Sequence, residues 1–201
     1  MGSRLSTELS WELVNMAEEG RAVWAAVSTE DPLFYGHHPM MEKLCRRGAE
    51  RLNAIFDSVG WPGREVIGGG CWAADWLLYH AIWSPNVMRR GLGLLRAGER
   101  RGEVDSLDVA LLEDRILMLE GTPQQYGTEM DWDDDGVLSP LPIADPVDVD
   151  VRRDAVGLGP LAESIEKIRA EARRYGDRAP ADRDVRRAAV EAWARSVGWR
   201  D

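Results

Sequence analysis

The chain has 201 residues and a formal net charge of −10, and 44% of its residues are hydrophobic. This composition is typical of a globular domain large enough to form its own core, and it argues against disorder on a large scale. Two cysteines exclude a disulfide framework, and the acidic balance offers no charged surface for a phosphate backbone, so we expect no nucleic-acid partner.

The acidic charge is local, because residues 103–150 hold 14 acidic side chains and one basic side chain. The longest apolar run, residues 71–83, is about half the length of a membrane-spanning helix and includes Asp75 and His80. We therefore expect no membrane partner and a cytoplasmic location.

Helical periodicity and turn residues predict helices through the first half of the chain. A first helix is expected over residues 4–28, and a second should run from Pro39 to Val59, since proline suits the first position of a helix. The third, Cys71 to Trp83, is apolar on nearly every side and therefore belongs in the middle of the domain.

Caps and breakers predict the remaining elements. Ser84 should cap a fourth helix beginning at Pro85, and Ser106 should cap a fifth that ends at Glu120. Prolines and glycines exclude a helix over residues 122–150, where Asp135-Gly136 predicts a hairpin.

Two further helices follow. Apolar spacing predicts a sixth helix from Val156 to Tyr175. A seventh, from Asp182 to Val197, is strongly charged and has a narrow apolar stripe that starts at Val185. It should form a peripheral appendage or an oligomer contact, and in the second case the protein is a homodimer.

The expected fold is mostly α: a compact bundle of about six helices, with a small two-stranded β-ribbon and a C-terminal helical extension. We place the ribbon within residues 122–143. The expected organisation is a helical domain over residues 1–165 and an extension over residues 166–201.

Four strings of the sequence together resemble one family. They are RLNAIFDSVGWPG (51–63), ADWLLYHA (74–81), LEDRILMLEGTPQQYGTE (112–129) and WDDDGVLSPLPIADPVDVDVRRDAVGLGPLAE (132–163). The chain is similar to the bacterial domain-of-unknown-function family 6624 over roughly residues 5–165. The resemblance implies a fold and the location of a site, but no activity.

The chain departs from the family's pattern at several polar positions. Tyr79 and Glu129 stand where glutamine is frequent in the family, and Cys45 and Gly48 stand where histidine and asparagine are frequent. If these positions form a site in the family, the resemblance implies a remodelled site here.

His80 is the main candidate for proton transfer or for ligand binding, because an imidazole on a buried helix needs partners for both nitrogens. The alternative is a core histidine that bonds a main-chain carbonyl or Tyr126. Asp75 on the same helix needs a cationic or hydrogen-bonding partner if it is buried, and Arg115 is the first choice.

We expect a site between the second and third helices and the PQQYGTE segment. Its catalytic groups would be His80, Glu129 and Tyr126. Its substrate-binding residues would be Gln124, Tyr79, Arg115, Trp76 and Cys45.

Each part of this site has a structural alternative. The PQQYGTE segment can be a polar lock that ties the ribbon to the helices, and the aromatic stripe that includes Trp76 and Tyr79 can be core. Cys45 can be a small buried residue, or it can face His80 as a reactive thiol–imidazole pair.

No cofactor and no metal ion are expected. Asp131-x-Asp133-x-Asp135-Gly136 matches half of a calcium loop, but Pro142 occupies the position of the bidentate glutamate. Weak cation binding there stays open, as does a metal site that joins His37 or His38 to His80 and Glu129.

Two functions follow from this pattern. The first is an enzyme that acts on a small molecule, with proton transfer by a buried histidine in a pocket lined by tryptophan and tyrosine. The alternative is a non-catalytic helical domain that binds a ligand or docks a protein partner through its acidic ribbon.

Overall fold

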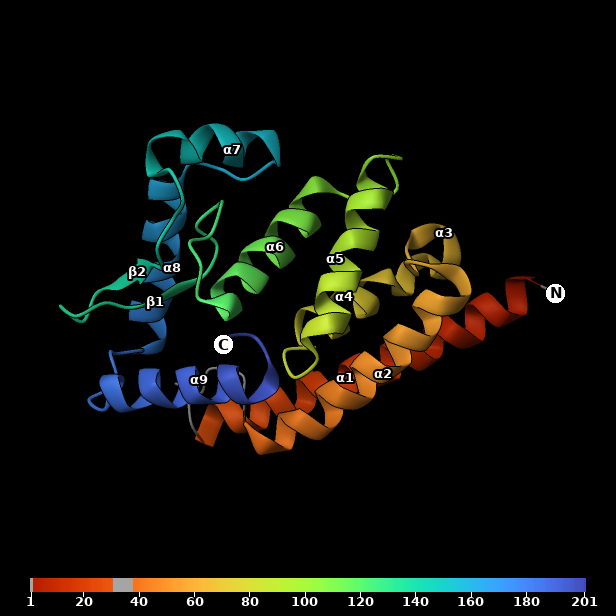
Figure 1. The fold of residues 1–201 in the computed structure, drawn as a ribbon, viewed down its shortest axis with the longest axis horizontal. Coiled ribbons are helices and arrows are strands. Elements are labelled where there is room, and N and C mark those ends of the chain that lie inside the picture. The colour runs from red at the N-terminus through yellow and green to blue at the C-terminus, as the bar shows by residue number, and fades with distance from the viewer. Residues whose placement is uncertain (1, 31–37) are drawn as a thin grey trace. The chain divides into compact units, whose positions relative to one another are not determined.

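The computed structural model describes residues 2–30 and 38–201 (Figure 1). The fold is mostly α with one small two-stranded antiparallel sheet, as the sequence predicts. The chain divides into two compact units, Met1–Val104 and Asp105–Asp201. The expected boundary at residue 165 falls inside helix α8 (Leu161–Tyr175).

All described secondary-structure elements of the first unit are helical. Its elements are α1 (Gly2–Glu30), α2 (Pro39–Val59), α3 (Arg64–Ile67), the 3₁₀ turn η1 (Gly68–Gly70), α4 (Cys71–Tyr79) and α5 (Pro85–Glu99).

Helix α4 ends at Tyr79, earlier than the predicted Trp83. The chain leaves the helix at His80, where φ is −95° and ψ is 2°, and then turns before Pro85 begins α5. Ser84 precedes α5 but makes no side-chain capping bond; its main-chain carbonyl accepts the first helical hydrogen bonds instead.

The predicted central position of α4 is confirmed, because it contacts α1, α2 and α5. Each neighbour approaches through a glycine. A Cβ on Gly20 of α1 would clash with the Trp76 ring, one on Gly48 of α2 would lie 3.0 Å from Leu77, and one on Gly91 of α5 would lie 2.5 Å from Leu78. Small residues therefore let three helices close around one apolar helix.

The second unit combines helices with the ribbon. Its elements are α6 (Ser106–Glu120), β1 (Met130–Trp132), β2 (Leu138–Pro140), η2 (Pro146–Asp148), α7 (Val149–Ala155), α8 (Leu161–Tyr175) and α9 (Arg183–Val197). Two expected details are corrected. Ser106 is the first residue of α6 rather than its cap, and the predicted sixth helix begins at Leu161 because Gly157 and Pro160 interrupt the apolar pattern.

The ribbon is the hairpin predicted from Asp135-Gly136, with Trp132 opposite Leu138 in register. Its turn is closed by Asp133, whose carboxylate accepts main-chain hydrogen bonds from Asp135 and Val137. Gly136 takes the positive φ of +73° that this turn requires.

Arginines of α8 and α9 form hydrogen bonds with the ribbon. Arg169 of α8 donates to the carbonyl of Leu138 at 2.8 Å, and Arg187 of α9 donates to that of Trp132 at 2.6 Å. Because α9 faces the ribbon with its arginines, the expected apolar stripe is not the buried face, and Val185 is 69% exposed.

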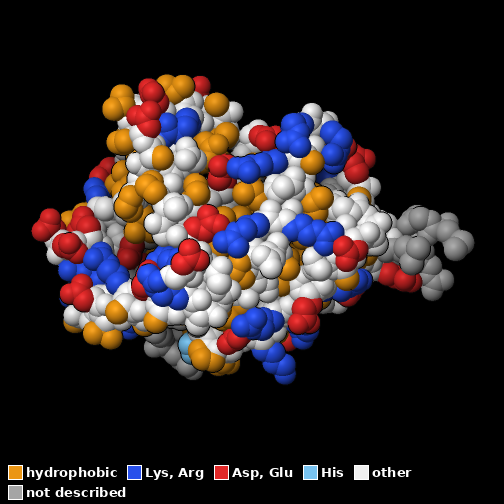
Figure 2. Space-filling model, viewed as in Figure 1, with side chains coloured by type: hydrophobic (Ala, Val, Ile, Leu, Met, Phe, Trp, Pro, Cys, Tyr) orange, Lys and Arg blue, Asp and Glu red, His pale blue; other side chains and the backbone are white. Residues whose placement is uncertain are grey.

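Figure 2 shows basic and acidic side chains interspersed on the face in view, without a single basic field. Within the described ranges, no helix combines the length and the apolar character needed to cross a membrane.

Candidate functional site

The loop that follows α6 is organised around one buried carboxylate. Asp114 is fully buried, and its two oxygens accept hydrogen bonds from the main-chain N–H groups of Gln125, Tyr126 and Thr128 and from the Thr128 hydroxyl. These distances lie between 2.6 and 3.1 Å. The N–H groups of this loop belong to no helix or strand, so the Asp114 carboxylate provides their hydrogen-bond acceptors.

Gln124 closes the same loop on itself. Its side chain is 1% exposed, donates to the carbonyls of Glu129 and Leu141, and accepts from the main-chain N–H of Glu129. Its main chain also forms an isolated parallel bridge with Ile143. These bonds join Gln124 to both ends of the ribbon, at Glu129 before β1 and at Leu141 and Ile143 after β2, which agrees with the polar-lock interpretation.

Arg153 of α7 is the third residue of this polar lock, which consists of Asp114, Gln124 and Arg153 with their hydrogen-bond partners. It is 2% exposed and donates to the carbonyl of Gly159, the carbonyl of Tyr126 and the hydroxyl of Ser164, at 2.6 to 2.7 Å. Burial lowers the pKa of the Arg153 guanidinium below its ordinary value. Its three hydrogen bonds to oxygen atoms compensate the charged guanidinium for the water contacts that it loses on burial.

The candidate acid Glu129 is ion-paired with Arg115, with Arg115 Nη1 2.9 Å from Glu129 Oε2. Each side chain is only 12% exposed. Within the second unit Arg115 pairs with Glu129, whereas Asp75 is half-buried in the first unit, so an Asp75–Arg115 pair stays a prediction.

His80 lies at the C-terminal end of α4 within a group of aromatic rings. Its Nδ1 is 2.8 Å from the main-chain carbonyl of Trp76, and its ring stacks on the Trp76 indole with 4.0 Å between centroids. The rings of Trp24 and Tyr79 lie edge-on at 5.2 and 5.4 Å. This is the main-chain-bonded arrangement that we gave as the structural alternative, with a half-buried ring.

The thiol of Cys45 is buried on α2, and burial raises its pKa to about 12. A thiol with this pKa stays protonated at neutral pH, so it is not a ready nucleophile.

The predicted catalytic and substrate-binding residues are divided between the two units. His80, Tyr79, Trp76 and Cys45 belong to the first unit, whereas Arg115, Gln124, Tyr126 and Glu129 belong to the second. Neither unit contains the whole set.

The metal site that the sequence left open would join His37 or His38 to His80 and Glu129. His37 lies outside the described residues, and His38 caps α2 by accepting a hydrogen bond from the main-chain N–H of Met40. Among the residues that the structure describes, no group of three or more His, Cys, Asp or Glu side chains could hold a metal ion.

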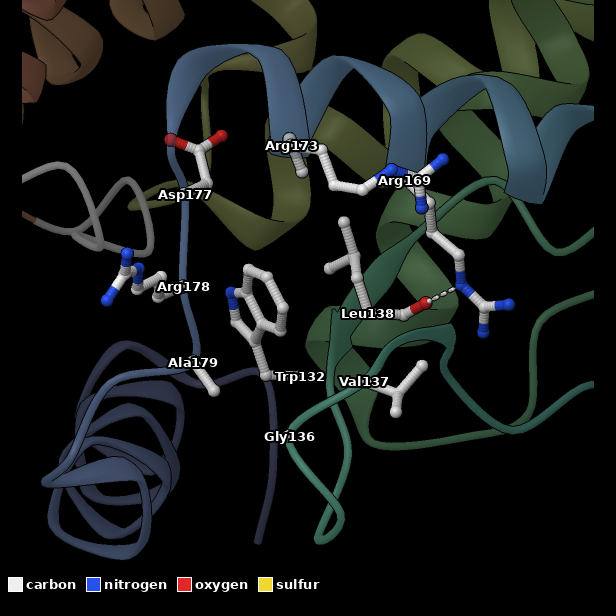
Figure 3. A pocket seen from close by; sticks show the side chains of 10 residues that line it. Trp132, Gly136, Val137, Leu138, Arg169, Arg173, Asp177, Arg178 and Ala179 are labelled. Carbon is white, nitrogen blue, oxygen red and sulfur yellow. Dashed lines mark hydrogen bonds between the residues drawn. The ribbon is translucent and has the colours of Figure 1, made fainter.

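The second unit contains a groove of about 320 Å³ beside the ribbon (Figure 3). Trp132 and Leu138, which are opposite each other on the two strands, form its apolar floor, and Val137 extends this floor toward the turn. One wall is the face of α8 that carries Arg169, Ala172 and Arg173, and the other is the segment 177–179. Figure 3 shows the Trp132 and Leu138 side chains between these two walls.

The walls of the groove are cationic. Three of its lining residues are arginines, Arg169, Arg173 and Arg178, and Asp177 is the single acidic lining residue. Arg169 is engaged with the ribbon and with Glu166, at 3.4 Å. The side chains of Arg173 and Arg178 are exposed and make no hydrogen bond or ion pair with the described residues.

Comparison with family models gives a match to a family of unknown function (DUF6624) over residues 7–191. The chain belongs to this family. Comparison with curated proteins gave no match, and comparison with solved structures gave none either. The match confirms the resemblance found in the sequence, and it extends through α8 into α9, beyond residue 165.

The motifs that carry the family resemblance coincide with the lock. Asp114, Gln124, the Tyr126-Gly127-Thr128 triplet and Arg153 all belong both to the quoted motifs and to the hydrogen bonds around the loop. In this chain these motif residues therefore hold the second unit together.

Sequence reasoning missed the groove. Two signals pointed to it: Trp132 and Leu138 flank the hairpin turn at matched positions, and Arg169 and Arg173 stand four residues apart on one helix. Neither signal shows from the sequence alone that the ribbon packs beside α8.

Proposed function

We propose that the protein is a non-catalytic ligand-binding domain and that its site is the groove between the ribbon, α8 and the segment 177–179. The observation that carries the proposal is the combination of an apolar floor, Trp132 and Leu138, with wall arginines, Arg173 and Arg178, whose side chains bond to none of the described residues. Ligand pockets commonly combine a mainly apolar lining with a few polar groups that fix orientation.

The volume also supports a small ligand. At about 320 Å³ the groove is at the lower end of the range of roughly 300 to 1,000 Å³ that is usual for ligand pockets. The indole of Trp132 offers a large rigid surface that loses little conformational entropy when a ligand packs against it.

The state of the acidic ribbon favours ligand binding over docking through its acidic tip. Asp134 is paired with Arg187 at 2.8 Å, and Asp133 bonds within its own turn and to Ser139. These carboxylates already have internal partners, which leaves less of the acidic surface to a protein partner.

A fragment screen by protein-observed NMR tests this proposal. We expect fragments with an apolar body to shift the indole N–H resonance of Trp132 and the methyl resonances of Leu138. Ala179→Trp should fill the groove and abolish these shifts, while Ala181→Trp, at an exposed position outside the lining, should leave them in place. A screen in which no fragment moves these resonances, or in which Ala179→Trp binds as wild type does, contradicts the proposal.

The enzyme hypothesis rests on one separate observation. A carbonyl partner requires a proton on Nδ1 of His80, so the bond to Trp76 fixes the ring and leaves Nε2 as the nitrogen that can accept a proton. Incubation with a cellular metabolite extract, followed by mass spectrometry, tests it. Turnover by the wild type that His80→Gln abolishes and His38→Gln preserves would favour the enzyme over the binding domain.

A further inference from the structure

The groove has an unbalanced positive charge. Arg169 and Arg173 stand one helical turn apart on α8 and both line the groove, as Figure 3 shows. Like charges at this spacing repel each other and destabilise a helix. Arg169 has two carboxylates nearby, since Glu166 lies 3.4 Å away and Asp133 interacts with it electrostatically, whereas Arg173 makes no ion pair with the described residues.

The other wall, the segment 177–179, carries no formal net charge. Arg178 and Asp177 are adjacent there, and both side chains are exposed. Glu166 lies beside Arg169 and Asp177 is adjacent to Arg178, so Arg173 is the lining arginine that has neither an ion pair with the described residues nor an adjacent acidic residue. The groove therefore suits a ligand with a single negative charge.

The position of Arg173 suits a carboxylate. A guanidinium presents paired N–H donors that match the two oxygens of a carboxylate, and such charge-assisted bonds are stronger than neutral ones. Ala172, the next residue on α8, is 7% exposed and adds apolar surface beside Trp132 and Leu138.

We propose that the groove binds a small organic monocarboxylate, whose carboxylate pairs with Arg173 and whose apolar body lies on Trp132 and Leu138. This inference rests on the proposed ligand-binding function and adds the chemical class of the ligand. An aryl-alkyl or short-chain alkyl carboxylic acid has the required form.

Titration calorimetry with matched ligands tests the inference. The probes are 4-phenylbutanoate, its neutral amide 4-phenylbutanamide, and 4-phenylbutyl phosphate, which differ in charge and share the apolar body. We expect the carboxylate to bind at least about tenfold more tightly than the amide, with a gap that narrows as salt rises. This salt dependence is measured on the wild-type protein and needs no variant.

Variants then locate the carboxylate. Arg173→Gln should remove the preference for the carboxylate and leave the affinity for the amide unchanged. Arg174→Gln is the matched control, because Arg174 is the neighbouring exposed arginine and does not line the groove. Circular dichroism verifies that both variants fold.

The outcomes separate this inference from the proposed function. Equal binding of the carboxylate and the amide overturns the inference and leaves the ligand-binding function standing. Preference for the phosphate by about tenfold or more also overturns it, in favour of a dianion. If none of the three probes binds while fragments still shift the Trp132 resonance, only the carboxylate class is wrong; if no fragment shifts it either, the ligand-binding function itself fails.

Discussion

Asp114 and Thr128 are joined by two hydrogen bonds to one oxygen: the main-chain N–H and the hydroxyl of Thr128 both donate to Asp114 Oδ2, each at 3.0 Å. The loop after α6 is thereby fixed to the helix by a side chain that is itself fully buried. Arg153 bonds the same loop from α7, so two charged residues hold an irregular segment that has little regular structure of its own.

Asp114→Asn should destabilise the protein strongly. The amide group would place N–H donors against the main-chain donors of the loop, and buried N–H groups would lose their acceptor. We expect a loss of about 3 kcal/mol in the free energy of unfolding, measured by urea denaturation.

Asp108→Asn on the same helix is the control for this variant. Burial, together with the nearby Asp105, raises the pKa of Asp108, so its charge is disfavoured in the folded state and its removal should cost little. Equal destabilisation by both variants would show that Asp114 is not the centre of the lock.

Two glycines of α5 should respond in opposite ways to alanine. A Cβ at position 91 would lie 2.5 Å from a Leu78 methyl, so Gly91→Ala should cost about 1–3 kcal/mol through overpacking against α4. Nothing lies within 4 Å of a Cβ at position 93, so Gly93→Ala should stabilise the helix by up to about 1 kcal/mol. Thermal unfolding monitored by circular dichroism measures both changes, and a stabilising Gly91→Ala would contradict the close packing of α5 on α4.

Cys45 should resist alkylation in the folded protein. Burial raises its pKa to about 12, so the thiolate that reacts with iodoacetamide is scarce at pH 8. Cys71, which is half-buried, is the internal reference, and peptide mass spectrometry compares the two labelling rates. Labelling of Cys45 as fast as that of Cys71 would revive the thiol–imidazole hypothesis.

The ribbon should loosen at low pH as Asp133 titrates. Hydrogen bonds from the main-chain N–H of Val137 and from the Ser139 hydroxyl are the largest causes that lower the pKa of Asp133. A folded-state pKa below the ordinary value means that this stabilisation is present above about pH 4 and is lost as the pH falls through the folded-state pKa.

NMR measures this transition through the amide resonances of the turn. Asp133→Asn should make the turn insensitive to pH in the same range, while Asp135→Asn, which removes a neighbouring carboxylate that does not close the turn, should keep the transition. A transition at or above the ordinary aspartate pKa would contradict the assignment.

The sequence by itself determined which segments form the helices and where the hairpin turns. The all-round apolar character of residues 71–79 placed that helix at the centre of its unit, and Asp135-Gly136 identified the hairpin turn, because both signals are local and depend on side-chain polarity and backbone freedom. Prediction failed at helix ends such as Tyr79, where the following turn rather than the apolar pattern decides the last residue.

Only the tertiary structure decided what the polar residues do. Asp114, Gln124 and Arg153 find their partners between 5 and 27 residues away, mostly in loops whose course no periodicity describes. The groove likewise depends on the ribbon and α8 lying side by side, a relation fixed by Arg169 reaching the carbonyl of Leu138, 31 residues earlier in the chain. Such long-range hydrogen bonds leave no pattern in the sequence, because any arginine and any carbonyl can form them.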